Sequence, residues 1–444
     1  MIARRPALLL LAAAVLIFLA VVAWRLLVLP SALSFAGGTE VDLSAYVGAS
    51  PTGVPAELAG ADELTKGKYL TEASDCAACH TAKEGKPYAG GRPFKLPFGT
   101  IYTPNITPDR ETGIGAWTNA EFLRAVHKGI GRRGERLYPA LPYASYTLLT
   151  DADVLAIRRY LASLPAVRQA NLPNTFSFPF SQRWLMGLWS AFFSPNKRFR
   201  PVAERDAQWN RGAYLVEAAG HCGECHTPRT VAQAMDTRRK FAGGQAEGWN
   251  AYNITADRLS GIGAWAAQDL STYLTTGYAP GHGVASGPMA EVVELSTSRM
   301  TPSDIAAMVA YLKTVPPVST KEAPAMAGPA PTIASAGSAG GDPAGRRLFE
   351  GACASCHAWT GRGAITPDQQ LTGNRAVNDR TAANVAMIIL DGSGSPQHAR
   401  AYMPSFRSSY SDAEIAAVSN FVTARFGSRP SRIGAADVKK MRDQ

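Results

Sequence analysis

The chain has 444 residues, of which 46% are hydrophobic and 18% are charged, so it can form several apolar cores and is neither disordered nor fibrous. This length predicts two to four domains at about 100 to 200 residues each. The 45 basic and 35 acidic side chains give a formal charge of +10, but no nucleic-acid-binding motif accompanies this charge, so we exclude nucleic acid as a partner.

The first 30 residues predict an export signal that stays in the membrane. Arg4 and Arg5 precede an uncharged run from Pro6 to Trp24. As a helix this run would be roughly 28 Å long, close to the hydrocarbon thickness of a bilayer, whereas a cleavable signal has about 7 to 15 apolar residues. We therefore expect residues 1–30 to be a signal-anchor transmembrane helix in the inner membrane, with the remainder in the periplasm. Cleavage after Ala36 is the alternative.

One sequence unit occurs three times. Each copy contains the motif Cys-x-x-Cys-His, at residues 76–80, 222–226 and 353–357. Residues 105–117 recur almost unchanged as residues 253–265, an offset of 148 positions, so the first two units are duplicates. Each unit closes with a capped helical pattern, at residues 150–164, 301–315 and 411–426.

These repeats predict the domain organisation. Residues 319–341 are rich in Ala, Pro, Gly and Ser and predict a linker, and residues 168–206 form an aromatic-rich connector. We expect its segment 176–193 to pack between domains; a membrane-interface helix or part of a quinone pocket are the alternatives. The predicted divisions are 1–30 anchor, 61–167 first domain, 168–206 connector, 207–318 second domain, 319–341 linker, 342–428 third domain and 429–444 C-terminal tail.

The Cys-x-x-Cys-His motif is typical of c-type haem attachment, because two thiols on one helical turn reach two vinyl groups while the adjacent His faces the iron. Zinc would require four N or S ligands, and a thioredoxin-like motif would lie at a βαβ crossover, which these helical patterns lack. All six cysteines fall within the three motifs. We predict three haem c groups held by Cys76, Cys79, His80, Cys222, Cys225, His226, Cys353, Cys356 and His357. The predicted fold class is all-α, with three tandem class I cytochrome c domains behind the transmembrane helix.

His80, His226 and His357 are the predicted proximal iron ligands, and methionine is the usual sixth ligand in electron-transfer cytochromes. Met403 and Met289, each in a predicted loop ahead of a closing helix, are the candidates in the third and second units. We expect the other nearby methionines to be packing residues: Met300, Met308 and Met387.

The first unit lacks a methionine. The 148-residue offset places Leu141 opposite Met289, and no Met occurs between residues 65 and 164. The first haem is therefore either five-coordinate or bound by another donor, for which His127 is the candidate; the alternative role of His127 is a surface or propionate contact.

Several longer motifs carry a family resemblance: residues 103–109 (TPNITPD), 113–115 (GIG), 137–143 (LYPALPY), 210–215 (NRGAYL) and 220–229 (GHCGECHTPR). With them, residues 61–440 resemble the three-haem cytochrome c subunits of membrane-bound periplasmic dehydrogenases that oxidise alcohols, aldehydes, gluconate or sorbitol. In alcohol-oxidising members the residue matching Leu141 is a methionine that ligates the first haem. This departure, with the retained anchor, favours the branch that resembles partners of molybdenum hydroxylases.

The resemblance implies an electron-transfer subunit that is not itself an enzyme. Its partners would be a dehydrogenase catalytic subunit, either molybdenum-dependent with an iron–sulfur subunit or a quinoprotein or flavoprotein, and membrane ubiquinone. One alternative is a membrane-tethered shuttle that donates electrons to a terminal oxidase. Another is a haem enzyme with a vacant iron position near Leu141, for which His127 would be the acid–base group.

Overall fold

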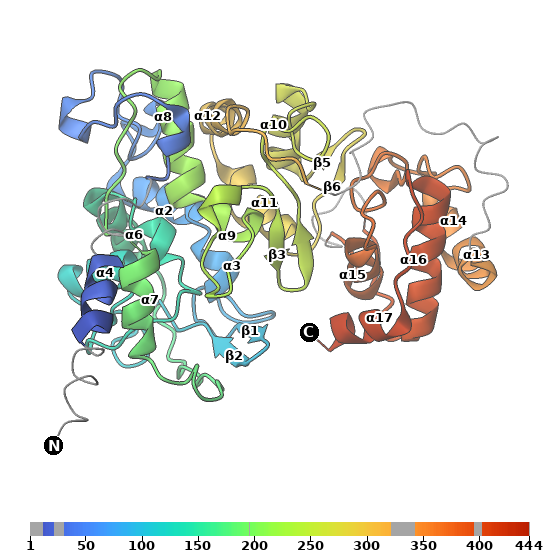
Figure 1. Cartoon of the computed structure of the whole chain (residues 1–444), viewed down its shortest axis with the longest axis horizontal. Helices are drawn as coiled ribbons and strands as arrows, with labels where there is room; N and C mark the ends of the chain where they lie inside the picture. The colour runs from blue at the N-terminus through green and yellow to red at the C-terminus, as the bar shows by residue number, and fades with distance from the viewer. Residues whose placement is uncertain (1–11, 22–30, 195, 321–341, 395–401, 444) are drawn as a thin grey trace.

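The computed structural model describes residues 12–21, 31–194, 196–320, 342–394 and 402–443. Figure 1 shows two bodies side by side. The larger body contains the first and second units, and the smaller one, at the right, contains residues 342–443. The predicted linker, residues 319–341, lies outside the described residues except for its first two positions.

The first and second units share one series of elements, to which the second adds a π-helical turn and a second hairpin. In the first unit these are α2 (Glu63–Ala73), α3 (Cys76–His80), β1 (Pro93–Leu96), β2 (Gly99–Tyr102), α4 (Asn119–Lys128), α5 (Tyr143–Tyr146) and α6 (Asp151–Ser163). In the second they are α8 (Ala207–Tyr214), the π-helical turn η4 (Leu215–Ala219), α9 (Gly223–His226), β3 (Gly244–Ala246), β4 (Trp249–Ala251), α10 (Ala267–Thr276), β5 (Tyr278–Ala279), β6 (Gly283–Val284), α11 (Pro288–Leu295) and α12 (Pro302–Leu312).

The third unit is shorter. It contains α13 (Pro343–Leu348), the π-helical turn η7 (Phe349–Cys353), α14 (Ala354–His357), α15 (Ala383–Asp391), α16 (Asp412–Phe426) and α17 (Ala435–Arg442). The connector contributes α7 (Leu185–Phe193). Single 3-10 turns are η1 (Ser34–Ala36), η2 (Leu43–Ala45), η3 (Ala56–Leu58), η5 (Thr237–Arg239), η6 (Thr297–Arg299) and η8 (Pro367–Gln369).

In every unit the first helix crosses the closing helix at a glycine. A Cβ atom on this glycine would meet a backbone carbonyl oxygen of the closing helix, so only hydrogen fits at the crossing. The distances from the added Cβ are 2.4 Å for Gly67 to Ala156, 1.9 Å for Gly212 to Ala307 and 2.1 Å for Gly345 to Ala417. This shared crossing places each Cys-x-x-Cys-His motif at the end of the first helix.

The three closing helices begin where the sequence predicts. The hydroxyl groups of Thr150, Thr301 and Ser411 each accept a hydrogen bond from a backbone N–H in the first turn of α6, α12 and α16. Ser411 forms a complete capping box with Glu414.

The all-α prediction was wrong in one respect. Three short antiparallel hairpins, β1–β2, β3–β4 and β5–β6, occur within the described residues. Their strands are two to four residues long, too short for an alternating pattern to emerge from the sequence.

The predicted transmembrane helix was also wrong. Within the described ranges, no helix is long and apolar enough to cross a membrane. Of the predicted anchor, the structure describes residues 12–21, which are helical. The rest of the predicted anchor, residues 1–11 and 22–30, lies outside the described residues. The inner-membrane anchoring and the periplasmic placement deduced from this helix are therefore not supported.

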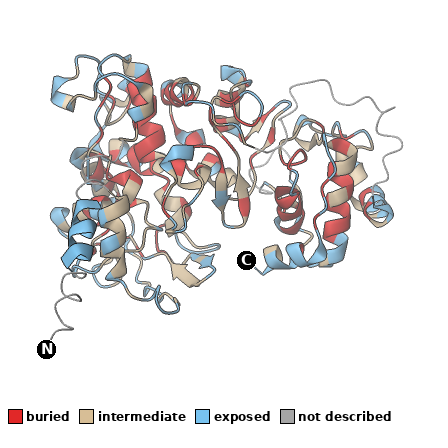
Figure 2. Ribbon diagram, viewed as in Figure 1, coloured by how far each residue is buried: buried red, intermediate tan, exposed pale blue. Residues whose placement is uncertain are grey.

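The units bury their apolar side chains in two separate cores (Figure 2). The first and second units share one continuous core, to which α2, α6, α8 and α12 all contribute. The third unit has its own core, built mainly on α15 and α16. Trp249 of the second unit, 8% exposed, belongs to this third core and links the two bodies.

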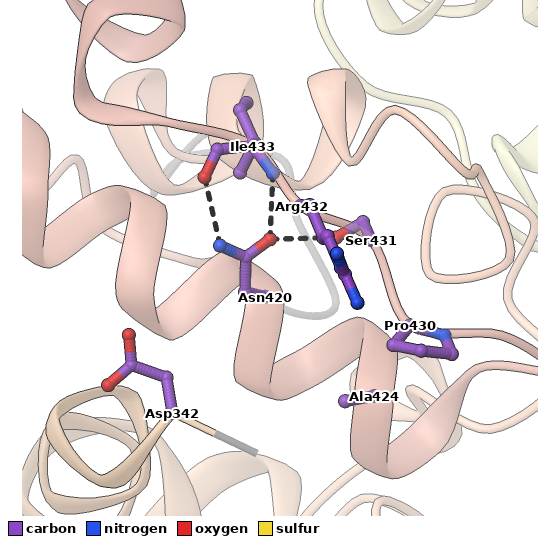
Figure 3. A pocket seen from close by; sticks show the side chains of 7 residues that line it. All are labelled: Asp342, Asn420, Ala424, Pro430, Ser431, Arg432 and Ile433. Carbon is purple, nitrogen blue, oxygen red and sulfur yellow. Dashed lines mark hydrogen bonds between the residues drawn. The ribbon is translucent and has the colours of Figure 1, made fainter. Parts of the chain in front are cut away.

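A pocket in the third unit lies beside α16 (Figure 3). The side-chain amide of Asn420 donates to the carbonyl oxygen of Ile433 at 2.9 Å and accepts from the N–H of Ile433 at 2.9 Å and from the Ser431 hydroxyl at 3.0 Å. The side-chain amide of Asn420 therefore holds the segment that leads to α17. This local structure accounts for the pocket.

Candidate haem sites

Each Cys-x-x-Cys-His motif forms a single helical turn, α3, α9 or α14, with both cysteines as free thiols. Burial raises the pKa of Cys76, Cys79 and Cys222 to about 12, and the pKa of Cys225 and Cys353 to about 11. These five thiols are therefore protonated at neutral pH, which does not suit a thiolate nucleophile.

The three motif histidines share one hydrogen bond. A backbone carbonyl oxygen lies 2.7 Å from His80 Nδ1, 2.6 Å from His226 Nδ1 and 2.7 Å from His357 Nδ1, and the carbonyls belong to Pro104, Tyr252 and Gln369. Because a carbonyl only accepts, Nδ1 carries the hydrogen and Nε2 is the nitrogen that can bind a metal. Burial also lowers the pKa of all three rings, so they are neutral ligands.

The residues at these positions fit a haem c. Each motif offers two free thiols for thioether bonds and one oriented imidazole, and its first cysteine lies against an apolar core. In the part of the chain that the structure describes, no group of three or more His, Cys, Asp or Glu side chains could hold a bare metal ion. Haem iron takes four ligands from its porphyrin, so one His and one further donor complete it; when bound, the group supplies one-electron chemistry.

The predicted sixth-ligand positions pack against the same apolar cores as the first cysteines of their motifs. Leu141 and Met289 pack against the same core as Cys76 and Cys222, and Met403 packs against the core that contains Cys353. Met289 lies in the first turn of α11, not in the predicted loop. Met403 pairs with Ser393 in an antiparallel bridge; residues 395–401 between them lie outside the described residues. The expected packing residues Met300, Met308 and Met387 are buried.

His127 is a buried group tied to the connector. Its ring is 2% exposed, and Nδ1 accepts a hydrogen bond of 2.7 Å from the guanidinium of Arg198. Burial and the Arg198 charge lower the pKa of His127 to about 4. His127 thus holds Arg198 against the first unit as a neutral ring.

Comparison with known proteins agrees with this geometry. The cytochrome c family matches residues 64–165 and 343–425. The cytochrome c subunit of the quinone-type alcohol dehydrogenase of Gluconacetobacter polyoxogenes is 37% identical over 86% of this chain and 84% of its own length. The gluconate 2-dehydrogenase cytochrome c subunit of Pantoea cypripedii is 35% identical over 86% of the chain and 90% of its own length. The chain belongs to the cytochrome c subunits of dehydrogenase complexes.

These cytochrome c subunits carry electrons and are not the catalytic subunits of their complexes, as predicted from the sequence. A further relative, one of the subunits of nicotinate dehydrogenase from Pseudomonas putida, is 40% identical over 84% of this chain. The chain spans only 31% of that protein's length.

The first two units of this cytochrome c subunit exchange hydrogen bonds symmetrically. The Tyr69 hydroxyl donates to Asp304 at 2.6 Å, from the first helix of one unit to the closing helix of the other, and the Tyr214 hydroxyl donates to Asp153 in the opposite direction. Across this seam α11 contacts α3 and α5 contacts η4, so the segment carrying each predicted sixth-ligand position borders the motif region of the other unit.

Sequence reasoning missed the groups that position the motifs. The carbonyl acceptors Pro104 and Tyr252 occupy equivalent places just before the repeated Asn-Ile-Thr segment, so the duplication could have revealed them. Gln369 has no counterpart by repeat alignment. The contact of Arg92 with the first motif carried no sequence signal, and Arg229 belongs to the quoted segment 220–229 although its bonds to Glu224 were not predicted.

The connector was predicted to pack between domains, and only part of it does so. The Trp189 indole donates to the carbonyl of Ala232 in the second unit at 2.9 Å and packs edge-on against Tyr143 of the first. Phe178 and Trp184 are 81% and 64% exposed, and α7 contains no buried residue (Figure 2).

Proposed function

We propose that this chain is the electron-transfer subunit of a dehydrogenase complex, that it holds three covalent haem c groups, and that it passes electrons from the catalytic subunit to ubiquinone. The observation that carries the proposal is the repeated motif geometry. Three times, a neutral imidazole is fixed by a carbonyl at Nδ1 beside two free thiols. A chance arrangement would not reproduce the same tautomer in three separate units.

The proposed ligands follow from this geometry. The paired cysteines of each motif form the thioethers, His80, His226 and His357 bind iron from one side, and Met289 and Met403 bind it from the other in the second and third sites. Leu141 offers no donor to the first site, so we expect the first site to differ from the other two in spin state and potential.

The three sites correspond to three proposed cytochrome c domains, residues 61–167, 207–318 and 342–428. The glycine crossing in each supports this division, because it recurs at the same place relative to the motif. The shared core of the first two units makes them one structural body that carries two sites.

The catalytic partner would determine the substrate. The relatives are named for nicotinate, alcohol and gluconate dehydrogenases, so similar cytochrome subunits serve different oxidations. The partner is either a molybdenum enzyme with an iron–sulfur subunit or a quinoprotein or flavoprotein. Purification of the native complex followed by mass spectrometry of the bound polypeptides identifies it; an oxidase core without a dehydrogenase subunit would contradict the proposal.

The mass of the mature chain tests the number of haems. We expect three haem additions that acid acetone does not extract. A Cys353→Ala/Cys356→Ala variant should lose one addition, and a Ser355→Ala variant, altered within the same motif but not at a thiol, should keep all three. A mature chain without added haem would refute the proposal.

Spectroscopy of the loaded protein tests the ligands. We expect one high-spin and two low-spin haems in the electron paramagnetic resonance spectrum, and Leu141→Met should convert the high-spin signal to low spin. Three low-spin haems in the unaltered protein would disprove the proposed role of Leu141. Oxidation of the reduced complex by a soluble ubiquinone analogue tests the acceptor.

A further inference from the structure

Arg92 lies at the seam between the first and second units, with its side chain 16% exposed. Its Nη1 donates to the carbonyl oxygen of Ala78 at 2.6 Å and to Glu291 Oε2 at 2.6 Å. Its Nη2 donates to both carboxylate oxygens of Glu247, at 3.2 and 3.1 Å. One guanidinium thus contacts three segments of the chain.

These contacts join parts of two different haem sites. Ala78 is the third residue of the first Cys-x-x-Cys-His motif. Glu291 lies on α11, two residues after Met289, the proposed sixth ligand of the second site. Glu247 lies in the turn between β3 and β4 of the second unit. Arg92 therefore connects the motif of the first site to the ligand helix of the second.

In the second unit Arg229 also contacts the motif, but the motif residue Glu224, and not the arginine, reaches the first unit. Arg229 donates to the carbonyl of Glu224, which occupies the position of Ala78 in the second motif, and to its carboxylate at 2.8 Å. The Glu224 carboxylate accepts from Ser145 on α5 of the first unit at 2.9 Å. The two connections bind the duplicated units reciprocally.

The two arginines are not copies of each other. The N–H of Gly90 donates to the His80 carbonyl, and the N–H of Gly243 donates to that of His226, so Gln245 occupies the place of Arg92 in the second unit. In both units a guanidinium therefore contacts the carbonyl of the third motif residue, but it comes from different sequence positions. The contact is thus not a product of the duplication alone, which indicates that it serves the sites.

A guanidinium suits this place because it presents several N–H donors in a fixed planar fork, whereas an ammonium group is a point charge on a flexible stem. The two carboxylates raise the pKa of Arg92 above its usual range, so the side chain stays charged.

We infer that Arg92 is a positioning residue that fixes the first haem motif against the ligand helix of the second site and so sets the electron exchange between those two sites. The inference rests on the proposed function for the identity of the sites. The contacts themselves do not depend on it.

The test compares Arg92→Gln and Arg92→Lys with Arg299→Gln in the haem-loaded full chain. Arg299 is a matched control, because it joins the same two units through a 3.0 Å ion pair with Glu72 and donates to the Glu294 carbonyl of α11 at 3.0 Å, but none of its hydrogen bonds reaches the first motif. Hydrogen exchange measured by mass spectrometry reports on residues 76–80 and 288–295. Flash photoreduction reports the rate at which electrons redistribute between the first two sites.

We expect both Arg92 variants to speed hydrogen exchange in both segments and to slow electron redistribution by about tenfold or more, as for other groups that orient ligands. Arg299→Gln should leave both the exchange of residues 76–80 and the electron redistribution unchanged. Exchange of residues 76–80 in Arg92→Gln no faster than in Arg299→Gln would overturn the inference whatever the haem content. An Arg92→Lys variant equal to the unaltered chain would also overturn it, because charge alone would then suffice. Absence of haem from the unaltered chain would refute the proposed function instead.

Discussion

The seam between the first and second units differs in kind from the seam between the second and third. The first two units share one apolar core, exchange tyrosine–aspartate hydrogen bonds in both directions and bury the Arg211–Asp304 ion pair. The third unit keeps its own core and meets the second through one large apolar side chain, Trp249, and a set of polar contacts.

Residues in and next to β4 make the polar contacts described here with the third unit. The backbone N–H of Asn250 donates to the side chain of Asn384 at 2.8 Å, and that side chain returns a bond of 3.0 Å to the Asn250 carbonyl. The guanidinium of Arg375 lies 4.7 Å from the ring centre of Tyr252, whose carbonyl holds His226. The comparison suggests that the duplicated units fold as one body and that the third is a module docked on it.

Replacement of Trp249 should break the second seam alone. Trp249→Ala removes a buried indole from the third core and should destabilise the third unit by about 3 to 5 kcal/mol. Denaturant unfolding followed by hydrogen exchange of α15 and α16 measures this loss, and α2 and α6 should keep their protection. Trp249→Phe, which keeps most of the apolar volume, should lose much less. Equal loss of protection in α2 would mean that the three units form one cooperative body.

A Gly→Ala substitution at the helix crossing makes the same change in each of the two bodies. Gly212→Ala and Gly345→Ala each force a methyl group against a carbonyl oxygen, and overpacking of this kind costs about 1 to 3 kcal/mol or more. Gly212→Ala should weaken protection in both the first and the second unit, because they share a core. Gly345→Ala should affect the third unit only. Gly351→Ala, with no atom within 4 Å of the added methyl, is the control.

The two tyrosine bonds of the first seam should differ in strength. Removal of the hydroxyl in Tyr69→Phe leaves Asp304 with two bonds from Arg211, at 2.8 and 2.7 Å. Tyr214→Phe leaves Asp153 Oδ2 with only the N–H of Gly53 at 3.0 Å. A hydrogen bond to a charged group contributes about 1.5 to 3 kcal/mol, so Tyr214→Phe should approach about 2 kcal/mol and Tyr69→Phe should cost less. Urea unfolding of both variants measures the difference; the reverse order would contradict the assignment.

A pH dependence should distinguish the loops of the two duplicates. The Ser319 hydroxyl and the Ser260 backbone N–H donate to Asp257 and lower its pKa to about 2. A lowered pKa means that this carboxylate stabilises the fold fully above about pH 4 and loses that contribution as the pH falls toward 2. Asp257→Asn should therefore cost about 1 kcal/mol at pH 7, and this cost should shrink as the pH falls below 4 and through 2.

Asp109 is the matched position in the first unit. It accepts from Thr112 and Glu111 but has no counterpart of the Ser319 bond, so Asp109→Asn should cost less at pH 7. Thermal unfolding across the pH range measures both variants. A cost of Asp257→Asn that is independent of pH would show that the carboxylate charge does not matter.

Local motifs carried most of what the sequence could predict. The three closing helices begin at the predicted Thr150, Thr301 and Ser411 because a cap and its first turn are encoded within four residues. The short hairpins were not predicted, because strands of two to four residues are too short to show an alternating pattern of apolar and polar residues. The membrane helix was predicted from apolar length alone, and the described helix is too short to support it.

For the sites, the sequence supplied the residue types but not their surroundings. Met289 was predicted to lie in a loop but lies in the first turn of α11, and its role as an iron ligand stays a prediction. The role of His127 depended on Arg198, which is 71 residues away and contributes its guanidinium only after the connector folds back.

By itself the sequence determined the three motifs, their repetition, the helix caps and the missing methionine of the first unit, because each is written in a few adjacent residues or a fixed offset. Only the tertiary structure decided which units share a core, which carbonyl holds each histidine and which arginine reaches each motif. These contacts join residues from 5 to about 235 positions apart, and such pairings follow from how the packed helices cross rather than from any local pattern.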